Sequence, residues 1–420
     1  MQNGALIVTV KMDRAELRGQ TNISDVNKLR KGLLFDNFMR KAGKEIAARV
    51  QTILGGFKLD FQVCIGQVDD NGSNMAGKYK GVQAVLLEHN SNCIFSSCGN
   101  HTLNLVGVDC AESCTEAITY FGTVQQIYNL FRSSPQRWEI LKQYLRVSQH
   151  GMSKTRWSAQ IDGVQPVTQH LNSVRKALHE LESLNLTAQA QTELQSIQKH
   201  MSKFECPLMS SLWMKLLTMI HQTTLVIEAR NATLDVERDN IESLINDIQQ
   251  ICEQGDVILT ESKLVAQTIG ISSEFSTNCN LPTESDAEQH CRVNLFLLII
   301  VSIQSGLTRR FESLQLICTL FGFLWKFNRL SNEDLLCAGE HFQQQYNKEI
   351  SKDLCDEIIF LKQIYSTNFK LDCKLKELLQ EILGVGLSEV FPNLTVALCI
   401  FVNLPASVVS DEHTFNVLKQ

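Results

Sequence analysis

The stretch that most restricts the fold is a short apolar run that ends in two carboxylates and a turn. Residues 59–65 alternate between apolar and polar side chains, which is the period of a β-strand. This run is followed by Gly66-Gln67-Val68-Asp69-Asp70-Asn71-Gly72-Ser73-Asn74. Apolar residues at helical spacing begin at Val82. A carboxylate such as Asp70, at a strand end before a Gly/Ser/Asn turn, is where α/β enzymes hold a metal ion. The alternative is that Asp70 caps the following helix.

A second strand and helix follow the first pair. The apolar stretch Cys93-Ile94-Phe95 leads into the residues from Cys98 to Leu105, where apolar residues recur at helical spacing. The sequence therefore predicts the order strand, helix, strand, helix.

Residues 151–384 show almost only helical periodicity. The apolar stripes are Leu171, Val174, Leu178, Leu181; Ile241, Leu244, Ile245, Ile248, Ile251; and Leu375, Leu378, Leu379, Ile382. We expect an α-helical bundle that buries these stripes, with a loop over 272–289. The most apolar run, 295–303, predicts a buried helix because a bilayer-spanning helix needs about 20 residues.

The net charge of −6 over 420 residues gives the chain no general attraction to nucleic acid. Affinity for DNA would need a local patch, and the candidates are Lys78, Lys80, Lys154 and Arg156, which are otherwise solvated surface residues. Trp157 either stacks on a base or anchors helix packing.

The 14 cysteines are scattered and no signal peptide opens the chain, which favours reduced thiols in the nucleus or, alternatively, the cytoplasm. Cys98 and His101, with Cys110 and Cys114, could supply four zinc ligands, but their spacing matches no standard finger. We expect instead that His101 is a buried hydrogen-bonding residue and that Cys98 and His101 support the strand before Asp70.

Several motifs together resemble the hAT transposase superfamily, in particular its zinc finger MYM-type and THAP-repressor-like group. The run from Gly66 to Gln83 is similar to the family's Gly-Gln-x-x-Asp-Gly-Ala-x-Asn-Met-x-Gly-Lys-x-x-Gly-Val-Gln, and 98–105 to its Cys-x-x-His-x-Leu-Asn-Leu. Residues 155–157 resemble its Thr-Arg-Trp, 391–394 its Tyr-Pro-Asn-Leu, and 405–415 its Pro-x-Ser-x-x-Ser-x-Glu-Arg-x-Phe.

The resemblance implies an α/β fold with a helical majority, in which a partial ribonuclease-H-like core is interrupted by a large all-α insertion. It implies an N-terminal segment at 1–55 without the first catalytic strand and a core portion at 56–150. The insertion would occupy 151–385, and the return to the core with the start of the dimerisation region 386–420. The chain would then be truncated at both ends relative to the family.

In the family, two Asp and one Glu hold two Mg²⁺ ions for phosphoryl transfer. Asp70 matches the second Asp and Glu412 the Glu, whereas Asp13, Asp25 and Asp36 lack the apolar strand context of the first Asp. Glu412 could equally complement a helix dipole. We therefore expect no catalysis, with Mg²⁺ relevant only to an active protein and zinc disfavoured.

The resemblance leaves two functions open. One is a transposase-derived protein that works by dimerisation, with itself or a related protein, and by binding DNA or chromatin. The other is an active DDE-type transposase subunit or fragment. We expect no membrane partner and no small-molecule substrate, and we expect the apolar tail after Phe391 to be partly uncovered.

Overall fold

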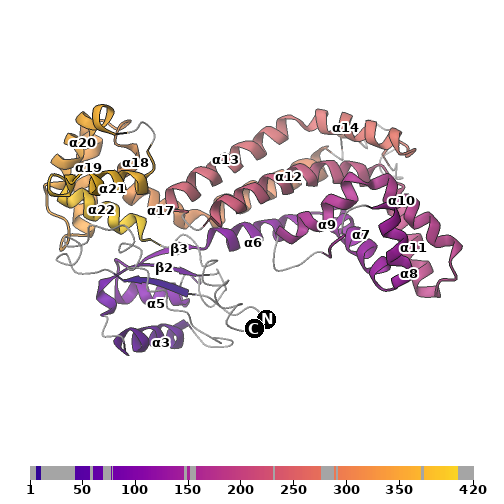
Figure 1. Ribbon diagram of the computed structural model, residues 1–420, viewed down its shortest axis with the longest axis horizontal. Coiled ribbons are helices and arrows are strands. Elements are labelled where there is room, and N and C mark those ends of the chain that lie inside the picture. Colours follow the sequence, from indigo (N-terminus) through magenta and orange to yellow (C-terminus); the bar gives the residue numbers. More distant parts are fainter. Residues whose placement is uncertain are drawn as a thin grey trace. The chain divides into compact units, whose positions relative to one another are not determined.

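The computed structural model describes residues 6–10, 43–56, 60–69, 77, 79–145, 149–151, 158–229, 232–275, 288–289, 292–369 and 373–404 (Figure 1). These residues are mostly helical, with one small sheet. They form two compact units. Unit 1 comprises Met1–Thr102, Val226–Asn240 and Phe311–Gln420, and unit 2 comprises Leu103–Leu225 and Ile241–Arg310.

The sheet of unit 1 has the order β1-β2-β3, with β2 in the centre. The strands are β1 (Leu6–Val10), β2 (Cys64–Asp69) and β3 (Ile94–Ser97). β2 runs parallel to β3, pairing Asp69 with Ser97, and antiparallel to β1, pairing Asp69 with Leu6. All six residues of β2 are buried, as expected of a strand covered on both faces.

Two features of the sheet differ from the sequence-based expectation. Residues 61–63 form the 3₁₀ turn η2 (Phe61–Val63) in place of the start of a strand. The physical reason is a local cap, because the Asp60 carboxylate accepts a hydrogen bond from the Gln62 N–H at 3.0 Å. The second difference is β1 itself, an apolar strand shortly before Asp13, where the sequence predicted none.

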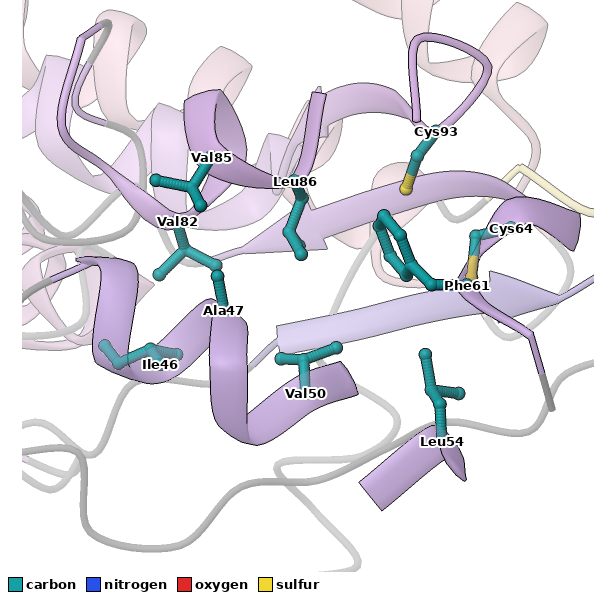
Figure 2. Packing of buried hydrophobic residues seen from close by; sticks show 10 residues of the cluster. All are labelled: Ile46, Ala47, Val50, Leu54, Phe61, Cys64, Val82, Val85, Leu86 and Cys93. Atoms are coloured by element: carbon teal, nitrogen blue, oxygen red, sulfur yellow. The ribbon is translucent and has the colours of Figure 1, made fainter. Parts of the chain in front are cut away.

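The helices α3 (Gly43–Gly56) and α5 (Val82–His89) form a core with η2 and the ends of the strands. Asn90 ties this layer together, because its side-chain amide donates to the carbonyls of Phe61 at 2.8 Å and Cys64 at 2.9 Å. Figure 2 shows the side chains that meet there: Ile46, Ala47, Val50, Leu54, Phe61, Cys64, Val82, Val85, Leu86 and Cys93. The predicted order strand, helix, strand, helix is confirmed, with α6 (Gly99–Ala111) as its last member.

The carboxy-terminal part of unit 1 is helical. Its helices are α17 (Glu312–Phe321), α18 (Phe323–Lys326), α19 (Asn332–Gln345), α20 (Leu354–Asn368), α21 (Leu375–Gly384), η5 (Leu387–Glu389) and α22 (Pro392–Val402). The expectation of an uncovered tail after Phe391 is wrong over the described residues. Leu394, Leu398 and Ile400 are buried, because α22 packs against α20 and α21.

The described part of unit 2 consists of helices and their connections, without a strand. It contains most of α6, then α7 (Thr115–Arg132), α8 (Pro135–Tyr144), α9 (Ser158–Gln169), α10 (Leu171–Glu180), η3 (Leu181–Ser183), α11 (Ala188–Met201), most of α12 (Glu205–Ile227), the part of α13 (Leu234–Glu253) from Ile241 onward, α14 (Gly255–Thr268), the π-helix η4 (Arg292–Leu297) and α16 (Leu298–Arg310). The start of α13, up to Asn240, belongs to unit 1. The helical stripes predicted from the sequence are confirmed, since their members are buried apart from the half-buried Ile245. Among the described helices none is long and apolar enough to cross a bilayer.

Candidate site at the carboxyl end of the parallel strands

Most residues that the sequence singled out for function lie outside the described part of the chain. This holds for Asp70 and Glu412, and also for Lys78, Lys154, Arg156 and Trp157. Lys80 is described and is exposed in the turn before α5. Cys98 and His101 are described at the start of α6. The roles of the six residues outside the described part, from Asp70 to Trp157, therefore stay predictions.

The two sequence motifs meet at the carboxyl ends of β2 and β3. Asp69, the neighbour of Asp70, pairs with Ser97 across the sheet, and its carbonyl accepts a hydrogen bond from the Cys98 N–H at 3.1 Å. The Cys98 carbonyl in turn accepts from the Thr102 N–H at 2.9 Å, so α6 begins directly where β3 ends. The carboxyl ends of parallel strands are where α/β sheets usually bind ligands. This edge of the sheet is our candidate site.

His101 differs in its environment from the sequence-based expectation. The expectation was a buried hydrogen-bonding side chain, whereas His101 is only partly buried and Cys98 fully buried. The buried face of α6 carries Thr102, Leu103 and Val106, and His101 lies one residue, about 100° of helix rotation, away from Thr102. His101 therefore lies at the edge of the buried face.

The described residues do not provide a complete metal site. No group of three or more His, Cys, Asp or Glu residues among them could hold an ion. For the four-ligand zinc alternative, a helical rise of about 1.5 Å per residue over α6 separates Cys98 from Cys110 by roughly 18 Å. Zinc ligation by these four residues is therefore disfavoured.

Glu237 is a buried acid at this site that the sequence analysis did not identify. Its side chain, from the first turn of α13, is 1% exposed and lies against Gly99, where the Cβ of any larger residue would overlap Oε1. Burial raises the pKa of Glu237 to about 8. The positive N-terminal end of α6 acts in the opposite direction, but the loss of water around a fully buried carboxyl is the larger effect. Glu237 is therefore mostly protonated at pH 7.

A second acid contacts the next residue of α6. The Asn100 side-chain amide donates to Glu228 Oε1 at 2.6 Å. Glu228 follows α12 and Glu237 opens α13, so the connection between these two helices supplies both acids to the first turn of α6. An N-terminal helix turn often binds phosphate, and the Glu228 carboxylate beside it disfavours that use here.

A signal for Glu237 was present in the sequence. Leu234, Ile241, Leu244 and Ile248 form an apolar stripe at helical spacing, and Glu237 occupies a position on that stripe. A charged residue at a core position is uncommon and indicates a buried polar contact. No comparable signal marked Gly99, whose close contact depends on α13.

No protein-family model matches the chain.

Proposed function

We propose that this chain derives from an hAT-like transposase and acts without cutting DNA, by self-association or pairing with a related protein and by binding DNA or chromatin in the nucleus. The supporting observation is the junction of the two family-like motifs. The end of the Gly-Gln-x-x-Asp strand and the start of the Cys-x-x-His helix are joined by the hydrogen bond from Cys98 to Asp69. A ribonuclease-H-like core around β2, interrupted by a helical insertion, is part of the proposal.

A third motif gives independent support. Within 391–394, which is similar to the family's Tyr-Pro-Asn-Leu, Pro392 opens α22 and the Asn393 side chain donates to Glu357 Oε1 at 2.6 Å. The Asn393 side-chain oxygen accepts from the Ser351 N–H at 2.9 Å. The motif thus has a definite packing role, which fits a retained fold better than a chance match.

The direction of β1 supports the absence of catalysis. A two-metal site needs its carboxylates at one place, because the two ions lie about 4 Å apart. β1 is antiparallel to β2, and its last residue, Val10, pairs with Cys64 at the start of β2. The carboxyl end of β1 therefore lies at the opposite edge of the sheet from Asp69, so this strand does not carry an acid to the Asp70 edge.

Incubation of the purified chain with supercoiled DNA and Mg²⁺ or Mn²⁺ tests the proposal. We expect no nicking above the level of an Asp70→Asn variant, because β1, the described neighbour of β2, does not bring an acid to the Asp70 edge. Cleavage by the unmodified chain that disappears in Asp70→Asn would show an active DDE-type enzyme. Sedimentation of the same preparation, alone and with duplex DNA, tests the binding half of the proposal.

A further inference from the structure

Unit 2 contains a pocket of about 290 Å³ bounded by α7, α9, the end of α11 and the start of α12. Its volume is near the lower end of the range for small-molecule sites. Its floor consists of apolar side chains that are almost completely buried: Val124, Ile127, Val167, Met201 and Met209. This floor suits an apolar body of the size of an aromatic ring or a medium-length alkyl chain.

The buried polar groups of the pocket wall already have partners within the protein. The Tyr120 hydroxyl donates to Ser210 Oγ at 3.2 Å, and the Thr123 hydroxyl donates to the Thr119 carbonyl at 2.8 Å. Burial raises the pKa of the neighbouring Cys206 thiol to about 12, which keeps it neutral. The deep part of the pocket therefore favours an apolar group over a polar one.

The rim carries nitrogen donors. Lys203 and His200 both line the pocket, and neither side chain has an ion pair or hydrogen bond within the described residues. Burial and the nearby Lys203 and Lys199 lower the pKa of His200, so its ring is neutral at pH 7 and offers one N–H. The rim thus presents one ammonium and one imidazole donor above an apolar floor.

Two acids at the rim limit which anions fit. Glu116 and Glu205 line the pocket from the first turns of α7 and α12, where they complement the positive helix ends. Their charges disfavour a multiply charged anion such as a phosphate. An ammonium ligand has no acceptor atom for the Lys203 and His200 donors, although Glu116 and Glu205 would attract its charge. A neutral alcohol could accept a hydrogen bond but would leave the Lys203 ammonium without an ionic partner.

We propose that this pocket binds a small monocarboxylate with an apolar body, whose carboxylate accepts hydrogen bonds from Lys203 and His200 while the body covers the floor. The assignment goes beyond DNA or protein association and does not depend on it. It concerns a bound ligand and includes no reaction.

Calorimetric titration of the full chain with octanoate tests the proposal, with 1-octanol and octylamine as probes of equal chain length. We expect octanoate to bind most tightly. Lys203→Met should weaken octanoate binding about tenfold, because it removes one charge-assisted hydrogen bond, and should leave 1-octanol binding unchanged. Lys348→Met, at an exposed position that does not line the pocket, should change neither affinity.

A second variant tests the location of the ligand. Val167→Phe places a larger side chain on the floor and should weaken octanoate and 1-octanol together, with the helical circular dichroism spectrum retained as proof of folding. No octanoate binding at millimolar concentration would overturn the proposal. So would equal affinity for the three probes, or octanoate affinity that is unchanged in either Lys203→Met or Val167→Phe.

Discussion

At the scale of single residues, the buried acid Glu237 makes the stability of the protein depend on pH. The unfolded chain releases this proton near pH 4.5, whereas the folded protein retains it to about pH 8. The free energy of unfolding should therefore fall as pH rises from about 4.5 to 8 and then level off. The total loss is on the order of 5 kcal/mol, since each pKa unit corresponds to about 1.4 kcal/mol.

Glu237→Gln removes this titration and keeps the side-chain shape. Urea unfolding between pH 5 and 9 should show a smaller decline in stability for this variant than for the unmodified chain. Glu242→Gln, at an exposed position of the same helix, provides the matched control and should keep the decline. Identical pH profiles for Glu237→Gln and the unmodified chain would show that the carboxyl is not held neutral.

A substitution at Gly99 tests the contact with Glu237 from the side of α6. Gly99→Ala should destabilise the protein by about 1–3 kcal/mol, because the added methyl group overlaps the Glu237 carboxyl. Gly122→Ala is the control, since Gly122 is exposed inside α7 and a Cβ there meets no atom within 4 Å. That change should stabilise by about 0.5–1 kcal/mol. Equal effects of the two substitutions in thermal unfolding would contradict the contact.

At the scale of secondary-structure elements, α20 holds the start of α22 through one carboxylate. Glu357 accepts hydrogen bonds from the backbone N–H groups of Asn393 at 3.2 Å and Leu394 at 2.8 Å, in addition to the Asn393 side chain. A carboxylate at this position satisfies amide groups that have no partner inside the helix and complements the helix dipole.

Glu357→Ala should lower the free energy of unfolding by about 2–4 kcal/mol, because it leaves buried donors without partners. Urea unfolding measures the change. The exposed Glu389 precedes the same helix, and Glu389→Ala should stay within about 0.5 kcal/mol of the unmodified chain. A decrease no larger for Glu357→Ala than for Glu389→Ala would mean that α22 is held by its apolar contacts alone.

At the scale of the whole molecule, the net charge of −6 opposes DNA binding, so any affinity must come from a few local cations. Lys80, exposed before α5, is the described member of the candidate patch. Lys80→Glu should weaken binding of a fluorescent duplex and reduce the slope of log affinity against log salt concentration by about 1, because one phosphate no longer has a cation beside it. The exposed Lys199 in unit 2 serves as the control. An equal weakening in Lys199→Glu would indicate non-specific charge repulsion in place of a patch.

Local patterns and distant packing differ in how far they could be predicted from the sequence. The sequence predicted correctly the helical stripes, β3 and the succession of α5, β3 and α6. Helix and strand periods depend only on residues that are neighbours in the chain. The turn at 61–63 was missed because one side-chain cap from Asp60 outweighs an alternating pattern. The tail after Phe391 was misjudged because burial depends on distant helices. The roles of Asp70 and Glu412 stay predictions.

The sequence by itself determined the helical stripes at 171–181, 241–251 and 375–382 and their apolar faces, since backbone hydrogen bonding and side-chain period are local properties. Only the tertiary structure decided that β1 runs antiparallel to β2, that Glu237 lies buried against Gly99, and that Asn393 binds Glu357. Each of these depends on segments far apart in the chain, whose packing sets solvent exposure and therefore the charge that an acidic group can carry.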